Sequence, residues 1–319
     1  MSDRLIEDFV TELQSAGISI GKDVQGSTMT TYRVGGTLSY CVHIDSYETV
    51  GIVSRLIENN FVGQLNESNV VTIGKGSNIL VSDEGFDGCV FIVDGELGEV
   101  LEIDELSDHE ISVKVGAGMA LPSFARQCVP NKISGLEFYV GIPGSVGGAV
   151  AMNAGGHGKQ TSDVLISCEV LNLELGLIEK FSRDSCEFEY RRSRFRPTDI
   201  IFSAQFEGKP GDPNEIKKEI DSIVQWRREF QPGGRNVGSV FQNPEDISSG
   251  ELIEKSKLKG VRIGKAHVSE KHANFIQADE GATAKDVAAL IELVKSTVLE
   301  STGYELHTEV RYIGKYDNG

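Results

Sequence analysis

The chain has 319 residues, of which 39% are hydrophobic, and its 31 basic and 48 acidic side chains give a net charge of −17. This length suits about two domains, and the composition is that of a folded globular protein. A nucleic-acid partner is disfavoured because phosphate binding needs clustered cations. No apolar run approaches the roughly 18 residues of a membrane helix, and the first residues lack a secretory pattern, so we expect a cytoplasmic protein without a membrane partner.

The five cysteines are scattered and contain no C-x-x-C motif. We therefore expect small core residues in a reducing compartment, without disulfides or cysteine-bound zinc. His267 and His272 are five positions apart, which does not match the histidine pair of a zinc-protease helix. No metal site is predicted.

The first part of the chain is rich in strand-like patterns. Five β-like runs occupy residues 39–44, 70–74, 78–82, 89–93 and 110–116. Helical periodicity in this region is confined to residues 46–60, which is too little helix for a doubly wound dinucleotide fold. The acidic stretch 101–110 predicts a surface hairpin.

The pattern changes after residue 207, and we place a domain boundary at 207–212. Asp212 is suited to cap a helix over 213–230, and Thr283 and Asp286 form a capping box for a helix that Gly303 ends. The elements expected in this part are a helix at 213–230, a strand at 237–241, a helix at about 250–259, a strand at 273–278, a helix at 284–301 and a strand at 307–313.

Two glycine-rich segments, GKGSN at 74–78 and the segment 141–158 with seven glycines, are candidates for phosphate binding. Glycine lets backbone N–H groups approach a ligand closely. Neither segment matches a common nucleotide fingerprint, so tight structural turns remain an alternative. Arginines gather at 191–196 and at 227–235, either as docking points for a small polyanion or as solvated faces.

A serine and a glutamate in the second part are candidates for chemistry. Ser239 follows a glycine at the start of the strand-like run in GSVFQNP, and Glu309 alternates with Val310 in HTEVRYIG. Both could project from strands of one small sheet. Taken singly, each is as well explained by a turn or a wet strand face.

Taken together, these segments resemble the UDP-N-acetylenolpyruvoylglucosamine reductase (MurB) family of flavoenzymes. The resemblance is carried by YRRSRF (190–195), GSVFQNP (238–244), LIEKSKLKGVRIGKAHVSEKHANFI (252–276) and TEVRYIG (308–314). The first part contributes TTYRVGG (30–36), GKGSNILVSDEGFDG (74–88) and LEFYVGIPGSVGGAVAMNAGGHG (136–158). No tyrosine-bearing insertion lies between Arg196 and Ser239, which suggests the shorter class of the family.

The resemblance implies an α+β fold. A helical segment at 1–27 would precede a vanillyl-alcohol-oxidase (PCMH)-type FAD-binding domain at 28–208 and a small α/β substrate-binding domain at 209–319. It also implies a monomeric, FAD-containing oxidoreductase that uses NADPH to reduce UDP-N-acetylglucosamine enolpyruvate to UDP-N-acetylmuramate, in peptidoglycan synthesis, with FAD held non-covalently.

The resemblance also assigns residues. Ser239 matches the proton donor, Arg191 the arginine at the substrate carboxylate and Glu309 the catalytic glutamate. Tyr190 and Asn243 match substrate-binding residues, and Arg227, Arg228 and Arg235 are candidates for the diphosphate. The expected FAD contacts are Tyr32, Arg33, Gly74, Gly76, Ser77, Asn78, Gly141, Pro143, Gly144, Ser145, Gly147, Gly148 and Asn153.

Two features depart from the family pattern: Gln242 stands where lysine is frequent, and Val237 stands where alanine is usual. Both bear on the diphosphate contacts more than on catalysis. Two other functions stay open, a non-covalent flavin oxidase of the same fold and a catalytically silent nucleotide-binding or scaffold protein. The joint presence of Ser239, Arg191 and Glu309 argues against the silent protein.

Overall fold

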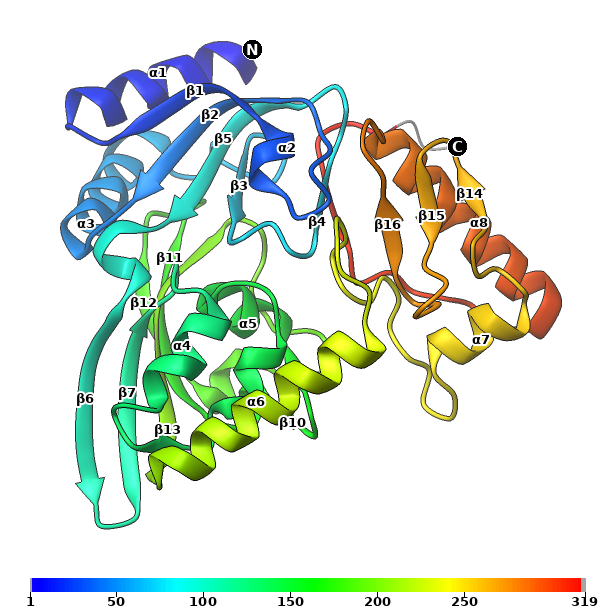
Figure 1. Ribbon diagram of the computed structural model, residues 1–319. Helices are drawn as coiled ribbons and strands as arrows, with labels where there is room; N and C mark the ends of the chain where they lie inside the picture. Colours follow the sequence, from blue (N-terminus) through cyan, green and yellow to red (C-terminus); the bar gives the residue numbers. More distant parts are fainter. Residues whose placement is uncertain (1, 317–319) are drawn as a thin grey trace. The chain divides into compact units, whose positions relative to one another are not determined.

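The computed structural model describes residues 2–316 (Figure 1). The chain forms two compact units, each assembled from separate segments. Unit 1 contains the residues up to Lys22, 39–75 and 87–225, and unit 2 contains 23–38, 76–86 and the chain from Trp226 onward. Each unit has its own hydrophobic core. Late in the chain, the change from unit 1 to unit 2 falls after Gln225, within a helix.

The first sheet has the strand order β1-β2-β5-β3, with β3 and β5 parallel. Its strands are β1 (Ile20–Gln25), β2 (Thr37–Ile44), β3 (Val70–Ile73) and β5 (Phe86–Val93). The helices of this region are α1 (Ser2–Ser15), α2 (Gly26–Met29) and α3 (Tyr47–Leu56), and a π-helical turn (Ile57–Phe61) extends α3. The Ser46 hydroxyl accepts a hydrogen bond from the Thr49 N–H and caps α3. Phe9 of α1 is fully buried in the core of unit 1.

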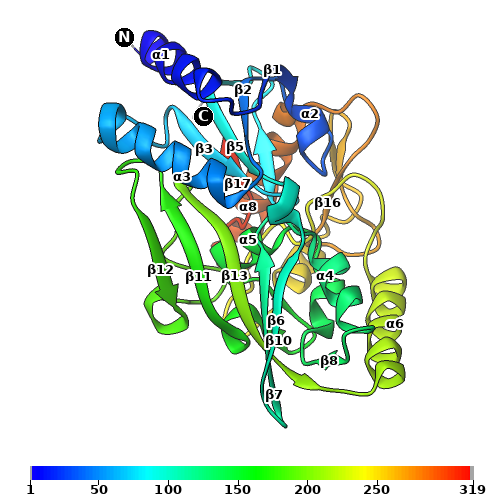
Figure 2. The same ribbon diagram turned by 90° about the vertical axis from the view of Figure 1, so that its left-hand side faces the viewer.

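The larger sheet of unit 1 is antiparallel along β12-β11-β13-β7-β6, and β8 pairs with β13 (Figure 2). Its strands are β6 (Val100–Ser107), β7 (Glu110–Gly116), β8 (Ile133–Ser134), β11 (Leu165–Asn172), β12 (Ile178–Ser182) and β13 (Asp199–Pro210). Strands β6 and β7 form a long hairpin (Figure 1), and most of β6 is exposed, which confirms the predicted acidic surface hairpin.

Short elements connect these strands. They are the helices α4 (Leu121–Cys128) and α5 (Val146–Met152), the small strands β9 (Gly155–Gly156) and β10 (Lys159–Gln160), and the 3₁₀ turns η2 (Gly95–Gly98), η3 (Glu137–Gly141), η4 (Thr161–Asp163) and η5 (Arg183–Cys186). Helix α6 (Pro213–Phe230) buries Ile216, Ile220 and Ile223 in the core of unit 1. The Asp212 carboxylate accepts hydrogen bonds from the Asn214 and Glu215 N–H groups, as its predicted capping role requires.

In unit 2, helix α8 packs on a three-stranded sheet of order β14-β15-β16 (Figure 1). The elements are β4 (Ile79–Val81), α7 (Ser249–Lys255), β14 (Arg262–Ile263), β15 (Ala266–Val268), β16 (Ile276–Ala278), α8 (Ala284–Thr302) and β17 (Arg311–Ile313). The predicted capping box of α8 is present between Thr283 and Asp286, and Gly303 ends the helix in the left-handed conformation. Strand β17 pairs in parallel with β4.

The strand predicted at 237–241 is wrong. Only Phe241 forms a bridge, to Thr308. Gly238 has a left-handed φ of 84°, which interrupts an extended strand. The side chain of Asn274 forms hydrogen bonds with the N–H and the carbonyl oxygen of Phe241, where a neighbouring strand would otherwise pair. The strands expected at 273–278 and 307–313 are shortened to β16 and β17.

All five cysteines are buried free thiols, as predicted for core positions. Between residues 2 and 316, none of the helices combines the length and apolarity that crossing a membrane requires.

Candidate functional site

Two of the predicted cofactor loops meet within unit 1. Gly74 follows β3, and Ser145 directly precedes α5. A Cβ atom added at Gly74 would lie 2.3 Å from the Ser145 hydroxyl oxygen, far inside van der Waals contact. Glycine is therefore required for this approach, which brings two loops suited to phosphate oxygens into one place.

The second of these loops is shaped by its own hydrogen bonds. The Ser145 hydroxyl accepts from the Gly148 N–H at 3.2 Å and so caps α5. The Gly147 N–H donates to the carbonyl oxygen of Ala117 at 2.8 Å. Gly144 has a φ of 139°, which only glycine adopts readily. Because Gly147 and Gly148 already have protein acceptors for their N–H groups, they hold the shape of the loop.

The loop is also tightly packed at its start. A Cβ atom at Gly141 would lie 3.0 Å from the imidazole ring of His157. Pro143 is exposed near the top of the loop, between buried or half-buried neighbours. The exposed residues of 141–148 are Pro143 and Gly148, which carry no long side chain and so allow a ligand to approach closely.

A second group of predicted cofactor residues lies in unit 2. A Cβ atom at Gly76 would lie 1.9 Å from the Met29 carbonyl oxygen, and Thr31 N–H donates to the Gly76 carbonyl oxygen at 3.0 Å. Arg33 is exposed and has a φ of 56°, in the left-handed region. Tyr32 is fully buried, and burial raises the pKa of its hydroxyl far above the usual value.

The Tyr32 hydroxyl has no hydrogen-bond partner among the residues that the structure describes. A buried hydroxyl without a partner costs about 1–3 kcal/mol, and a polar group of a bound molecule would remove that cost. Glycines packed against neighbouring backbone and a buried hydroxyl awaiting a partner both fit a nucleotide cofactor.

Arg191 lies in unit 1 on a turn with unusual backbone geometry. Its φ is 57°, and Glu189 and Arg192 exchange backbone hydrogen bonds around it. A non-glycine residue in this region is uncommon, and such strain concentrates at functional sites. The buried Asn153 amide donates a hydrogen bond to the Glu189 carbonyl oxygen at 2.9 Å. A guanidinium N–H of Arg191 donates to the Gly155 carbonyl oxygen at 3.1 Å.

Further arginines follow Arg191 closely in the sequence. Three of them are ion-paired with glutamates: Arg192 with Glu189 (3.6 Å), Arg194 with Glu187 (3.5 Å) and Arg196 with Glu174 (3.1 Å). These three form a solvated charged face, which was one of the two interpretations of the cluster. Tyr190 is 48% exposed, and its ring centre lies 5.0 Å from the Arg191 guanidinium.

Ser239 and Glu309 lie on adjacent segments of unit 2. The Glu309 N–H donates to the Val240 carbonyl oxygen at 2.8 Å, and the bridge between Phe241 and Thr308 continues this antiparallel pairing. Ser239 directly precedes Val240, so the hydroxyl-bearing and carboxylate-bearing residues lie on neighbouring stretches of backbone. Both are half-buried. The two candidates are therefore brought together, although the segment of Ser239 is not a strand.

Sequence patterns did not single out Asn274, which holds one of these segments in place. Its buried amide donates to the Phe241 carbonyl oxygen at 2.8 Å, and its carbonyl oxygen accepts from the Phe241 N–H at 2.9 Å. Its backbone oxygen also accepts from the Val240 N–H. The sequence signal that could have indicated this role is an asparagine inside the apolar run HANFI, because a buried amide needs polar partners.

Asn78 holds the other segment. Its side-chain amide donates to the Glu309 carbonyl oxygen at 2.8 Å, and its backbone oxygen accepts from the Arg311 N–H at 3.0 Å. It was predicted as a cofactor contact, as was its half-buried neighbour Ser77. The structure shows that Asn78 also fixes the backbone of the candidate catalytic glutamate.

The predicted diphosphate residues lie in unit 2. Arg227 is half-buried, its Nε–H donates to the Gln231 side-chain oxygen at 2.9 Å, and burial lowers its pKa. Arg228 is exposed, and Arg235 is half-buried. The exposed Asn243 accepts a hydrogen bond at its side-chain oxygen from the N–H of Ser249, the first residue of α7, at 3.0 Å.

Comparison with known proteins matches two family models. The C-terminal domain of UDP-N-acetylenolpyruvoylglucosamine reductase matches residues 231–313, and an FAD-binding domain matches residues 61–182. A solved reductase of this name (MurB) from Thermus caldophilus superposes with a TM-score of 0.75 at 30% identity, covering 93% of this chain and 99% of its own. These matches confirm the predicted fold class and the FAD cofactor.

Curated relatives match over almost their whole length. The reductase of Bacillus pumilus is 36% identical over 97% of this chain and 99% of its own, and that of Anoxybacillus flavithermus is 39% identical over 97% and 100%. The chain belongs to the UDP-N-acetylenolpyruvoylglucosamine reductase family.

Proposed function

We propose that this chain uses NADPH and FAD to reduce UDP-N-acetylglucosamine enolpyruvate to UDP-N-acetylmuramate, a step of peptidoglycan synthesis. The family relationship supports this reaction. The observation that supports the residue assignment is the backbone pairing of the Ser239 and Glu309 segments, because it puts the hydroxyl-bearing and carboxylate-bearing residues on adjacent stretches of one unit.

The chemistry that FAD supplies when bound is hydride transfer, from NADPH and then to C3 of the enolpyruvyl group. The glycine contacts at Gly74 and Gly76, the loop at 141–148 and the Tyr32 hydroxyl are the features that would hold it. Arg33, Ser77 and Asn153 belong to the same proposed set. Holding the cofactor is the part of the proposal that backbone shape supports best.

Ser239 would deliver the proton. Hydride addition at C3 leaves negative charge at C2, conjugated with the substrate carboxylate, and this carbon must be protonated. A hydroxyl is a weak acid, but the enolate is a strong base. Glu309, on the adjacent segment, would polarise or protonate the enolate, and Asn78 keeps its backbone in position.

Arg191 would bind the substrate carboxylate. A guanidinium forms paired hydrogen bonds to a carboxylate and stabilises charge that grows on it. The side chain is already anchored to Gly155 through one N–H group. Tyr190, Asn243, Arg227, Arg228 and Arg235 would contact other parts of the substrate, the arginines its diphosphate.

We further propose that the protein is cytoplasmic and monomeric, with functional domains at 28–208 and 209–319. Five buried free thiols are consistent with a reducing compartment. Size-exclusion chromatography with light scattering tests the monomer, and an elution mass of two chains would contradict it.

The reaction itself is tested by supplying purified protein with FAD, NADPH and the enolpyruvyl sugar nucleotide. We expect NADPH consumption that depends on the sugar nucleotide and a product heavier by two hydrogen atoms. NADPH consumption that instead forms hydrogen peroxide, with the sugar nucleotide unchanged, would favour a flavin oxidase and contradict the proposal.

A further inference from the structure

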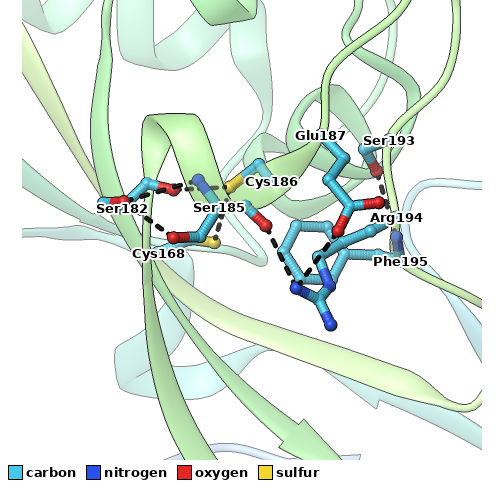
Figure 3. Close-up of polar contacts among 8 residues, drawn as sticks. All are labelled: Cys168, Ser182, Ser185, Cys186, Glu187, Ser193, Arg194 and Phe195. Carbon is cyan, nitrogen blue, oxygen red and sulfur yellow. Dashed lines mark hydrogen bonds and ion pairs between the residues drawn. The ribbon is translucent and has the colours of Figure 1, made fainter.

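Two buried thiols lie in contact in unit 1, and neither belongs to the residues assigned above. The sulfur atoms of Cys168 and Cys186 are 3.9 Å apart, and the two residues are 1% and 0% exposed (Figure 3). Cys168 lies in β11, and Cys186 ends the 3₁₀ turn η5. Strand β12 returns antiparallel to β11, with Ser182 opposite Ser167, so the following turn places Cys186 beside Cys168.

The Cys186 thiol donates a hydrogen bond to the Ser182 carbonyl oxygen at 3.3 Å, and its pKa is nonetheless lowered. A hydrogen bond from Cys168 lowers the pKa of Cys186, burial opposes this effect, and the positive charge of Arg194 adds to it. Arg194 is held in place because its N–H groups donate to the carbonyl oxygens of Ser185 at 3.2 Å and Cys186 at 3.0 Å (Figure 3). A thiolate beside a cation is the reactive form of cysteine.

The other cysteines have no such surroundings. Burial raises the pKa of Cys41 to about 11, and that of Cys89 and Cys128 to about 12. The Cys128 thiol donates to the Phe124 carbonyl oxygen at 3.4 Å, which makes it a matched buried control without a sulfur partner.

We propose that Cys168 and Cys186 form a reversible disulfide when the protein meets a hydroperoxide. The Cys186 thiolate attacks one oxygen of hydrogen peroxide, the O–O bond breaks, and Cys186 sulfenic acid and, with one proton, water are formed. The Cys168 sulfur then attacks the Cys186 sulfur, the S–O bond breaks, and hydroxide leaves and takes up the Cys168 proton as water. In sum, two thiols and one peroxide give one disulfide and two waters.

The geometry supports both steps. A disulfide bond is about 2.05 Å long, so the sulfurs must approach by roughly 2 Å. Cys186 lies at the end of a single 3₁₀ turn whose first three residues are exposed. One short turn opens locally far more easily than a sheet strand, which gives a small oxidant access and allows the sulfurs to close.

The test treats the folded full-length protein with hydrogen peroxide in small molar excess and then removes the peroxide. The protein is next unfolded, its remaining thiols are alkylated, and it is digested with trypsin. Cleavage after Lys180 and Arg183 separates the two cysteines into peptides 160–180 and 184–191. We expect these peptides to appear joined, with a mass two hydrogens below their sum, and to separate on treatment with dithiothreitol. Two of the five thiols should resist alkylation.

The Cys128→Ser variant should give the same joined peptide in the same yield, whereas Cys168→Ser and Cys186→Ser should give none. If a variant fails to fold, the digest of the wild-type protein still tests the proposal, because it shows whether the joined peptide forms. Absence of the joined peptide in peroxide-treated folded protein would overturn the proposal, as would its formation only in denaturant. This result is independent of the reductase activity.

Discussion

The candidate residues of the two units are positioned in different ways. Arg191 in unit 1 is held by a local turn: a strained φ of 57°, flanking backbone bonds and the Asn153 amide. Ser239 and Glu309 in unit 2 are held by pairing between segments about 70 residues apart, which Asn274 and Asn78 fix through buried or half-buried amides. A strained turn tied down by two hydrogen bonds therefore positions one proposed group, and backbone pairing between segments positions the others.

This difference predicts how each region fails. A change at the Arg191 turn should alter one interaction and leave the unit folded. A change at an amide of unit 2 should loosen the pairing and thus lower stability together with activity. The following variants test this contrast, beginning with the largest expected effect.

Ser239→Ala removes only the hydroxyl, so the pairing of its segment should survive. We expect flavin reduction by NADPH to continue nearly unchanged, while reduction of the enolpyruvyl group slows by about 10²-fold or more, the usual scale for loss of a positioned acid. Stopped-flow absorbance separates the two half-reactions. Equal slowing of both would make Ser239 a structural residue.

Asn274→Ala leaves the buried N–H and carbonyl oxygen of Phe241 without their partners. We expect a loss of roughly 2–6 kcal/mol in the free energy of unfolding, about 1–3 for each of the two buried groups. Urea denaturation measures it. Asn131→Ala, which removes an exposed amide bond to Gln127, is the control and should change stability by less than about 0.5 kcal/mol. Similar losses of stability in both variants would contradict the role of Asn274 in holding the Phe241 segment.

Arg191→Lys keeps the charge but loses the planar fork. We expect substrate reduction to fall by roughly 10- to 100-fold with no change in the thermal midpoint. Arg192→Lys, beside it and ion-paired on the surface with Glu189, should keep activity within about two-fold. Full activity of the Arg191→Lys variant would contradict the proposal that Arg191 binds the substrate carboxylate.

Gly74→Ala forces a methyl group against the Ser145 hydroxyl. We expect FAD to bind about ten-fold more weakly, equivalent to about 1.4 kcal/mol. The double variant with Ser145→Ala makes room again and should recover part of the affinity, a coupling that independent sites would not show. Gly98→Ala, with no atom within 4 Å of the new methyl, is the control. Titration followed by FAD fluorescence measures the affinity of each variant for FAD. Unaltered FAD binding by Gly74→Ala would contradict a close contact between the cofactor and the loop at Gly74.

Glu169→Gln tests a side-chain network of unit 1. Burial raises the pKa of Glu169, but hydrogen bonds from Lys114, Ser203 and Tyr47 outweigh it and lower the pKa overall. A lowered acid pKa adds stability that is present above the unfolded value and lost as the pH falls through the folded value. We expect Glu169→Gln to cost about 1 kcal/mol near neutral pH and less below about pH 4. A constant difference across that range would contradict the ion pair.

Sequence patterns predicted the elements whose signals are local. The capping box of α8, the cap of α6 and the strands β2, β3 and β5 all appear close to their predicted positions. Strands β11, β12 and β13 were not anticipated. Strand β13 pairs with the distant β7, whereas β11 and β12 form a hairpin in which Leu171 lies opposite Ile178. The prediction of a strand at 237–241 is wrong because the Asn274 side chain, and not a neighbouring strand, forms hydrogen bonds with the backbone of Phe241.

The same distinction applies to the candidate site. Motif resemblance identified Ser239, Glu309 and Arg191, but it did not indicate what positions them. Asn274 lies 33 residues from Phe241, and Asn78 lies 231 residues from Glu309. Contacts at such separations leave no periodic trace in a single sequence, so only the folded structure shows them.

The most direct test of the proposed reaction is an anaerobic absorbance spectrum of the FAD-loaded protein. We predict that NADPH bleaches the flavin band and that one equivalent of UDP-N-acetylglucosamine enolpyruvate then restores it in full. A band that NADPH bleaches and only oxygen restores, with the sugar nucleotide without effect, would contradict the account.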